Sequence, residues 1–392
     1  MSEKIRLGII GVGNMGSAHG TNIVGGRCPD FELRAVADVN PARLEWAREH
    51  LGAVECFDNA IAMLDSGKID ACMVCVPHYD HAKYAMECMK RGIHVMVEKP
   101  AGVYTKQVRE MNAEADRHPD VVFGMMFNQR TNCVYRKMRE LVQSGRYGRI
   151  RRTNWIITDW YRPQAYYDSG DWRATWSGEG GGVLLNQCPH QLDLWQWICG
   201  MPVAVQSNMR FGQWHDIEVE DDETTYVDYE NGATGGFVTT TGDYPGTNRL
   251  EISGEKGKLV LENGAMKWWR LRIPEPQVRF ESKESFDAID MDVEEITSDE
   301  PETAHAGILQ NFANAILHGE ALISPGEDGL SELTLSNAAY LSQWTGNRPI
   351  RLPMDEAAFD RELAARAEKS AFHDGGEAHP DGKYSVRWQV KW

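Results

Sequence analysis

The sequence contains no apolar run long enough to cross a bilayer, which takes about 20 residues. It is also short of positive charge, because 41 lysines and arginines stand against 58 aspartates and glutamates, a net charge of -17. A surface this acidic repels phosphate backbones. We therefore expect neither a membrane protein nor a nucleic-acid-binding protein. Because the N-terminus shows no secretion signal, we expect a cytoplasmic location.

Metal-binding patterns are missing as well. The 8 cysteines are scattered, and only Cys72 and Cys75 form a C-x-x-C pair. That pair lies in an apolar run typical of a buried strand, in which alternation places the two thiols on opposite faces of the sheet. Since neither a second pair nor a histidine cluster accompanies it, we expect no metal site.

The first third of the chain alternates strand-like and helix-like segments, which is typical of βαβ units with parallel strands. The expected strands are Ile5–Ile10, Leu33–Ala37, Ala71–Val76, His94–Val97 and Val121–Met125, and the expected helices are Met15–Val24, Pro41–Leu51, His81–Arg91 and Thr105–Ala115. A length of 392 residues allows two domains. We expect residues 1–125 to form a doubly wound α/β domain of the Rossmann type.

The pattern changes after Phe127. Strand-like runs flank the turn signals Asn231-Gly232 and Asn263-Gly264, which predicts consecutive hairpins. The expected strands here include Thr224–Tyr229, Ala233–Thr240, Leu250–Ser253 and Lys258–Glu262, and the expected helices are Cys133–Ser144, Gly307–His318 and Leu330–Gln343. We expect residues 126–353 to form an α+β domain with a large, open, mainly antiparallel sheet. Because exposed sheets commonly associate, we also expect a homo-oligomer.

Residues 354–392 are interpreted as a C-terminal extension. The stretch Met354–Lys369 has the pattern of a polar helix. The closing YSVRWQVKW alternates aromatic and apolar residues with polar ones, which predicts a half-buried strand that docks on the sheet or on a neighbouring subunit.

The hexapeptide GVGNMG follows the first expected strand, opens the first expected helix and fits the pattern G-x-G-x-x-G. In this setting Gly11 permits a tight turn, Gly13 lets a pyrophosphate approach the backbone, and Gly16 allows close packing of the helix on the strand. Asp38, at the end of the second expected strand, would bond the ribose hydroxyls and repel a 2′-phosphate. We therefore expect NAD in preference to NADP, a preference that Arg43 can soften.

Two further segments contain candidate catalytic groups. Lys99, within VMVEKPAG, follows a strand at the sheet edge where ligands bind in such folds. In GGGVLLNQCPHQLDLW the polar residues Asn186, His190 and Asp193 interrupt an apolar run at spacings that place them on one face of a helix. Pro189 leaves the helix start open, so the shared face is expected chiefly from His190 onward.

Together these motifs resemble the Gfo/Idh/MocA oxidoreductases, a family named for glucose–fructose oxidoreductase and inositol dehydrogenase. The resemblance covers residues 5 to about 353 and includes VADVNPAR, VPHYDHAKYAMECMKRGIHVMVEKP and NFANAILHGEALISPGEDGLSEL. It implies that Lys99 stabilises charge on the reacting oxygen and that His190 takes the hydroxyl proton as hydride passes to NAD. Many members have an aspartate where this chain has Asn186, an amide that hydrogen-bonds but cannot act as a base. Asp193 would orient His190 or serve as a structural cap.

The resemblance also implies which residues line the site. The catalytic residues would be Lys99, His190 and Asn186, with the polar face around His190 looking across the nicotinamide toward Lys99. The cofactor-binding residues would be Gly11, Gly13, Asn14, Met15, Gly16, Asp38, Arg43, Pro77, His78, His81, Glu98, Lys99 and Asn128. The substrate-binding residues would be Tyr161, Trp172, Arg173, Asn186, His190 and Asp193, and Arg130 is also placed to reach the pocket.

The substrate expected from the sequence is a carbohydrate. The stretch YRPQAYYDSGDWRATWSGEGGG offers aromatic faces with interspersed polar groups, which suits the apolar face and hydroxyl edge of a sugar. NQCPHQLDLWQW with an aromatic C-terminal extension is similar to members that oxidise the C3 hydroxyl of glucosides. The alternatives are an inositol dehydrogenase, a redox-neutral glycosidase that retains NAD, and a non-catalytic nucleotide sensor. The presence of both Lys99 and His190 argues against the sensor.

Overall fold

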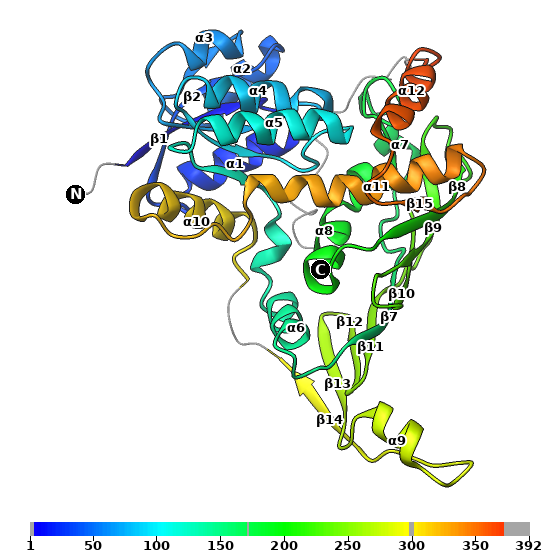
Figure 1. Cartoon of the computed structure of the whole chain (residues 1–392). Helices are drawn as coiled ribbons and strands as arrows, with labels where there is room; N and C mark the ends of the chain where they lie inside the picture. Colours follow the sequence, from blue (N-terminus) through cyan, green and yellow to red (C-terminus); the bar gives the residue numbers. More distant parts are fainter. Residues whose placement is uncertain (1–3, 171, 298–301, 372–392) are drawn as a thin grey trace. The chain divides into compact units, whose positions relative to one another are not determined.

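The computed structural model describes residues 4–170, 172–297 and 302–371, and the chain divides into two compact units (Figure 1). The first unit comprises Met1–Thr131 and Glu302–Thr334, and the second comprises Asn132–Pro301 and Leu335–Trp392. No helix within the described ranges is both long and apolar enough to span a membrane.

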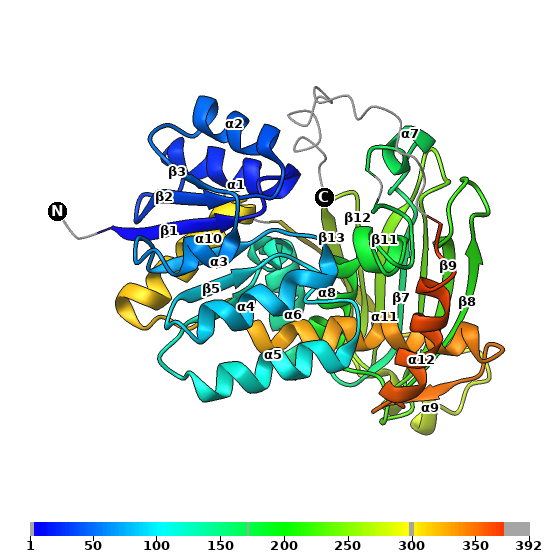
Figure 2. The same ribbon diagram turned by 90° about the horizontal axis from the view of Figure 1, so that it is seen from above.

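The first unit is built on a parallel sheet of six strands in the order β3-β2-β1-β4-β5-β6. The strands are β1 (Ile5–Ile10), β2 (Phe31–Ala37), β3 (Glu55–Phe57), β4 (Ala71–Val74), β5 (His94–Val97) and β6 (Phe123–Met125), and the helices between them are α1 (Asn14–Val24), α2 (Pro41–His50), α3 (Ala60–Leu64), α4 (His81–Met89) and α5 (Thr105–Arg117). Figure 2 shows α1 and α2 on one face of the sheet and α4 and α5 on the other. This doubly wound arrangement confirms the expected Rossmann class and has its switch point between β1 and β4.

Local signals account for most of these elements. Asn40 accepts a hydrogen bond from the Ala42 backbone N–H at 2.9 Å and Pro41 occupies the first helical position, so α2 begins where its cap predicts. The sequence pattern missed β3 and α3, because segments of 3 and 5 residues are too short to show a period.

One helix from late in the chain belongs to the first unit. Helix α10 (Ala304–His318) buries Ile308 and Phe312 in its core, and the Phe312 ring stacks on Phe31 of β2 with 6.1 Å between centroids. Gln310 also donates a hydrogen bond to Asp30 at 2.6 Å. The expected continuous domain over 126–353 is therefore interrupted at 302–334. The apolar face of α10 is visible in the sequence, but its period does not say which sheet the face covers.

The second unit contains a sheet of nine strands in the order β14-β13-β12-β11-β7-β10-β9-β8-β15. The strands are β7 (Ile150–Ile157), β8 (Ala204–Phe211), β9 (Glu220–Asp228), β10 (Thr234–Thr240), β11 (Asn248–Gly254), β12 (Gly257–Glu262), β13 (Ala265–Leu271), β14 (Met291–Ile296) and β15 (Ile350–Arg351), and the helices are α6 (Cys133–Gln143), α7 (Gln164–Tyr167), α8 (Pro189–Cys199), α9 (Glu275–Glu281) and α12 (Glu356–Ala367). Helix α11 (Gly329–Trp344) begins in the first unit and belongs to the second from Leu335 onward. Only β7 and β10 pair in parallel, so the sheet is mainly antiparallel as expected.

The expected hairpins are present. Asn263 and Gly264 have φ values of 52° and 75°, the left-handed pair that a tight turn between β12 and β13 requires. Gly232, with φ of 80°, closes the turn between β9 and β10.

The two faces of the large sheet differ. Trp195 of α8 stacks on Phe237 of β10 with 5.5 Å between centroids, and Trp155 of β7 meets Phe237 edge-on at 6.2 Å. Helix α8 therefore closes a buried aromatic layer on one face. On the strands, Ile156 and Tyr226 alternate with buried residues and are exposed. Because of this exposed apolar surface, we still predict a homo-oligomer.

The C-terminal extension is described only in part. Its expected helix is α12, and Asp355 caps it by accepting a hydrogen bond from Ala358 N–H at 3.0 Å. The strand expected in YSVRWQVKW lies outside the described residues.

Glu223, in the middle of β9, is expected to lower the stability of the protein as the pH rises. It is fully buried, accepts hydrogen bonds from the Ser207 and Thr225 hydroxyls, and burial raises its pKa to about 8. The unfolded chain releases this proton near the ordinary glutamate pKa of about 4.3. Between about pH 4.3 and pH 8 the folded state thus holds one more proton and loses stability with increasing pH.

We expect Glu223→Gln to abolish this contribution. As the pH rises over that range, the free energy of unfolding of the variant should increase relative to that of wild type by up to about 1.4 kcal/mol per pH unit. Urea unfolding at several pH values measures the difference. Glu230→Gln, at an exposed position after β9, is the control and should follow wild type. Parallel pH profiles of wild type and Glu223→Gln would contradict the prediction.

Candidate active site

The glycine loop between β1 and α1 has the backbone that a bound phosphate requires. Gly11 has φ of 89°, and a Cβ there would lie 2.5 Å from the Cys75 carbonyl oxygen. A Cβ at Gly16 would lie 1.8 Å from the Gly11 carbonyl oxygen, so only glycine fits either position. A Cβ at Gly13 meets nothing within 4 Å, which leaves open space at the N-terminus of α1. Exposed backbone N–H groups and the helix dipole make such a terminus suited to a pyrophosphate.

Asp38 follows β2 and lies against this loop. Its carboxylate accepts hydrogen bonds from Val12 N–H at 2.6 Å and from Asn40 N–H at 2.8 Å. Arg43 donates from Nε to the Val12 carbonyl at 2.7 Å and places its guanidinium over the Trp46 ring. These hydrogen bonds fix Asp38 beside the loop, and Arg43 holds the loop's shape.

The position of Asp38 gives a prediction about cofactor choice. Asp38→Asn keeps one acceptor oxygen for the backbone but removes the charge that repels a 2′-phosphate. We expect the ratio of kcat/KM for NAD over NADP to fall by about 10- to 100-fold, since a like-charge contact is worth a few kcal/mol. Initial rates with both cofactors measure the ratio.

Asp116→Asn is the matched control, because Asp116 is exposed on α5, on the opposite face of the sheet from α1 and α2 (Figure 2). An unchanged cofactor ratio in Asp38→Asn would remove Asp38 from this role.

The residues that follow β4 join two loops of the first unit. His81 is buried, and its ring nitrogens contact the Pro100 carbonyl at 2.6 Å and the Val76 carbonyl at 2.8 Å. Burial lowers the pKa of His81. His81 is expected to bind the cofactor. In the structure both of its ring nitrogens face backbone carbonyls, and these contacts connect the two loops. His78, two residues after Val76, is buried beside the His81 ring, and Pro77 precedes it.

Lys99 directly follows Glu98, a buried carboxylate that contacts His19. Glu98, at the end of β5, lies 2.6 Å from Nε2 of His19 on α1, and its second oxygen accepts the Lys99 backbone N–H at 3.2 Å. Burial would raise the pKa of Glu98, but the hydrogen bond and charge of His19 outweigh it and lower the pKa to about 2. Glu98 is therefore an anion that fixes the backbone from which the partly exposed Lys99 side chain extends.

The residues after β6 are mostly structural. Arg130 is buried and contacts Asp328 at 2.5 Å and the Ile323 carbonyl at 3.3 Å, so it is used within the first unit and does not serve the pocket as expected. Asn128 is also buried and lies 3.5 Å from Nδ1 of His305. Burial lowers the pKa of His305 to about 3, which makes it a neutral neighbour.

The segment of the second unit that contains the candidate catalytic residues is not one continuous helix. Residues 183–187 form a single π-helical turn, and α8 begins at Pro189. Asn186 therefore lies before the helix, and only His190 and Asp193 share a face of α8. His190 is 8% exposed and Asp193 is 1% exposed. Asp193 is expected to contact the substrate. In the structure its side chain is buried and accepts a hydrogen bond from Gln196 at 3.1 Å.

Glu220 of β9 holds the start of this segment. Its carboxylate accepts hydrogen bonds from Gly182 N–H and Leu184 N–H, both at 2.9 Å, and from the Tyr340 hydroxyl at 2.7 Å. Burial raises the pKa of Glu220 to about 7. A Cβ at Gly182 would lie 2.0 Å from the Glu220 carbonyl oxygen, so this close approach requires glycine.

Aromatic and polar groups of the preceding loop meet around Asn186. Nη1 of Arg173 donates to the Tyr166 hydroxyl at 3.0 Å, and the same hydroxyl receives Nδ2 of Asn186 at 3.3 Å and Nε2 of Gln187 at 3.2 Å. The Arg173 guanidinium also lies 4.6 Å from the centre of the Trp172 ring. Tyr161 is exposed, while Trp176 is buried against Tyr340 and Trp344 and is a core residue. This cluster offers one cation, amides and aromatic faces to a polar ring-shaped ligand.

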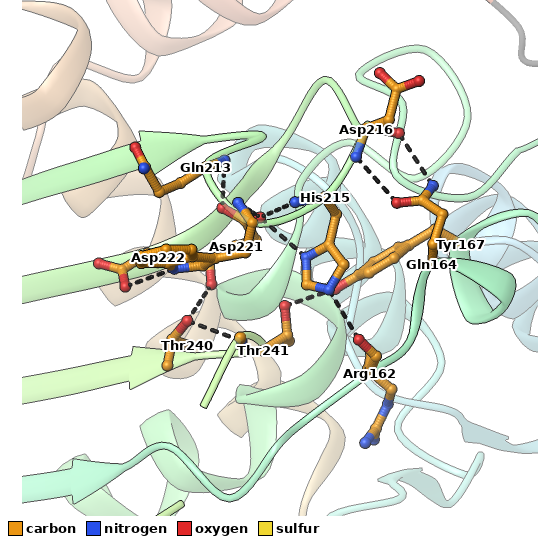
Figure 3. A network of polar contacts seen from close by, with 12 residues as sticks. Arg162, Gln164, Tyr167, Gln213, His215, Asp216, Asp221, Asp222, Thr240 and Thr241 are labelled. Atoms are coloured by element: carbon orange, nitrogen blue, oxygen red, sulfur yellow. Dashed lines mark hydrogen bonds and ion pairs between the residues drawn. The ribbon is translucent and has the colours of Figure 1, made fainter. Parts of the chain in front are cut away.

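A second network fastens the start of this loop (Figure 3). His215 lies between Asp221, 3.0 Å from Nδ1, and the Arg162 carbonyl, 2.8 Å from Nε2. Tyr167 shares a hydrogen bond of 2.8 Å with Thr241. The aromatic loop is thereby tied to the ends of β9 and β10. Across the described ranges, no group of three or more His, Cys, Asp or Glu side chains is placed to hold a metal ion.

Several supporting residues were missed from the sequence. His19, Glu179 and Glu220 are each buried ionisable groups with polar partners. The sequence contained a signal for Glu220. An acidic run, EDDE, opens a strand whose other residues alternate between buried and exposed positions. His19 and Glu179 gave no local signal, since their importance comes from partners elsewhere in the fold.

Both units are similar to known proteins. Residues 5–125 match the oxidoreductase family with an NAD-binding Rossmann fold, and residues 135–260 match the GFO/IDH/MocA C-terminal domain. The chain is 26% identical over 267 residues to the myo-inositol 2-dehydrogenase of Thermotoga maritima, which covers 66% of this chain and 75% of that protein. It is 27% identical over 248 residues to the D-glucoside 3-dehydrogenase of Escherichia coli, which covers 59% of this chain and 68% of that protein.

A solved structure extends the similarity to both units. The WlbA dehydrogenase of Chromobacterium violaceum, in complex with NADH and UDP-GlcNAcA, has a TM-score of 0.77 and 28% identity to this chain. The match covers 91% of this chain and 98% of that one.

Proposed function

Because the chain belongs to the Gfo/Idh/MocA family and is an NAD-dependent oxidoreductase of the sugar and cyclitol type, we propose that it oxidises the C3 hydroxyl of a glucoside to a ketone. The observation that supports a sugar ring is the cluster of Tyr166, Trp172, Arg173 and Gln187 around Asn186. Aromatic faces beside amide and guanidinium groups match a ring with one apolar face and a hydroxyl edge.

Each catalytic group has a separate task in this proposal. His190 removes the proton from the hydroxyl that is oxidised, because an imidazole is a general base near neutral pH. The Lys99 ammonium stabilises the negative charge that develops on that oxygen. NAD, when bound at the glycine loop and Asp38, supplies the hydride acceptor. Asn186 contributes a hydrogen bond but no charge.

The surroundings of these groups support the assignment. Glu98 fixes the backbone of Lys99 through its second oxygen, and Glu220 fixes the turn that leads to His190. Anchored backbones of this kind keep a reacting group in place without reorganisation during the reaction.

Other features support the proposed location and assembly. All 8 cysteines lie within the described ranges and are free thiols, which fits a reducing compartment such as the cytoplasm. The exposed strand residues Ile156 and Tyr226 favour a homo-oligomer formed through the large sheet.

The experiment that tests the substrate is product analysis by NMR after incubation with NAD and a panel of glucosides and inositols. A 3-keto glucoside supports the proposal. An inosose with the glucosides untouched would make the protein an inositol dehydrogenase, the second candidate, which the myo-inositol 2-dehydrogenase relative favours. Release of the aglycone without net NADH would indicate a redox-neutral glycosidase. NAD binding without any turnover would favour a nucleotide sensor.

A further inference from the structure

Glu179 is a buried carboxylate beside Asn186 that the proposed reaction does not use. Its side chain is 2% exposed and lies in the glycine-rich stretch before the π-helical turn. One carboxylate oxygen, Oε1, accepts a hydrogen bond from Nδ2 of Asn186. The same Nδ2 also donates to the Tyr166 hydroxyl at 3.3 Å.

These two contacts determine how the Asn186 amide is turned. A carboxylate only accepts hydrogen bonds, so the amide must direct its NH₂ group, and not its oxygen, at Glu179. An amide has two N–H bonds, and Glu179 and Tyr166 receive one each. The carbonyl oxygen of Asn186 consequently points away from both partners, and the amide has no further proton to offer a ligand.

Glu179 is itself held by the loop. Its other oxygen, Oε2, accepts the backbone N–H of Ala174 at 2.6 Å, and Oε1 lies 3.8 Å from the Arg173 guanidinium. Ala174 has φ of 54°, a left-handed conformation that alanine rarely adopts without support from its surroundings. At Gly178 a Cβ would lie 2.4 Å from the Trp172 carbonyl oxygen, so the loop closes tightly on itself. The carboxylate thus connects the loop that presents Arg173 to the turn that presents Asn186.

We propose that Glu179 is a positioning residue that fixes the orientation of the Asn186 amide, so that toward any further partner Asn186 acts only as a hydrogen-bond acceptor. The inference rests on the proposed function, in which Asn186 contributes a hydrogen bond in the active site. The oxygen of Asn186 then has a fixed direction. The negative charge stays on Glu179, beside the Arg173 guanidinium.

Exchanging the carboxylate and the amide between positions 179 and 186 tests this proposal. Glu179→Gln makes the amide orientation of Asn186 ambiguous, because glutamine can face it with either an oxygen or an NH₂ group. Asn186→Asp places two carboxylates in contact, which disfavours the charged pair. We expect kcat/KM for the substrate to fall by about 10- to 100-fold in each single variant, with unchanged affinity for NAD. In the double variant Glu179→Gln/Asn186→Asp the glutamine donates to the new carboxylate, and we expect kcat/KM to return to within about tenfold of wild type.

Glu218→Gln is the matched control, because Glu218 is also a carboxylate that accepts a backbone N–H of this loop, from Trp176 at 3.3 Å. It should not restore activity to Asn186→Asp. If the losses of the two single variants multiply in the double variant, the positioning role is wrong, even where unfolding experiments show that the two side chains stabilise each other.

Unfolding of the four proteins needs no substrate, so it tests the contact independently of the reaction. Stability losses that simply add in the double variant overturn the proposal. Loss of the whole proposed function has a different signature, because then wild type itself shows no turnover on any sugar or cyclitol, while NAD binding and the coupled stability of the pair remain.

Discussion

Replacing Lys99 by methionine lowers kcat for hydroxyl oxidation by about 100- to 1,000-fold, the range found when one preorganised donor to a developing oxyanion is removed. Methionine has a similar length and no charge, so it removes the ammonium while filling the space. The affinity for NAD should stay within about fivefold of wild type, because the glycine loop and Asp38 supply most of the expected cofactor contacts. Steady-state NADH formation and fluorescence titration with NAD measure the two quantities.

Lys90→Met is the control for this substitution. Lys90 lies at the end of α4, is exposed, and pairs with Glu87 at 2.8 Å on the surface. Its loss should leave turnover unchanged. Full biological activity of Lys99→Met would favour the nucleotide sensor, since a sensor needs bound NAD but no hydride transfer.

Replacing His190 by asparagine lowers kcat by about 100- to 10,000-fold near neutral pH, because it removes the general base. The loss should shrink as the pH rises, since hydroxide from the solvent then takes the substrate proton in place of the imidazole. A pH–rate profile of the variant shows this recovery. A variant that only disturbs packing would lose activity by the same factor at every pH, which is the result that would remove His190 as the base.

His318→Asn controls for the loss of a histidine. His318 is exposed at the end of α10 and should have a profile like that of wild type. Because His190 is 8% exposed, the unfolding free energy of His190→Asn must be measured beside its rate, so that activity is compared between folded proteins.

The elements that could be predicted from the sequence depend on neighbouring residues. The glycine loop requires backbone conformations that only glycine adopts without strain, and Gly11 adopts one with φ of 89°. Asn40 and Pro41 start α2 through a cap that spans two residues. The turn at Asn263-Gly264 needs only its own two left-handed residues. Each of these was visible in a window of a few positions.

Only the main groups of the candidate site could be proposed from the sequence. Asp38, Lys99 and His190 were selected by residue type, position and family resemblance. What surrounds them was not, because His19 meets Glu98 across 79 positions and Leu184 meets Glu220 across 36. The burial of Asp193 and the use of both His81 ring nitrogens by backbone carbonyls also depend on packing that no spacing reveals.

By itself the sequence determined a doubly wound domain, a mainly antiparallel sheet and the residue types of an NAD-dependent reaction, because periodicity and turn chemistry act locally. Tertiary structure decided that α10 packs in the first unit, that a π-helical turn separates Asn186 from α8, and that Glu179 turns the Asn186 amide. The physical reason is that a period reports which side of an element is apolar. The partner of a buried polar group is set by whichever distant segment the fold brings within hydrogen-bond reach.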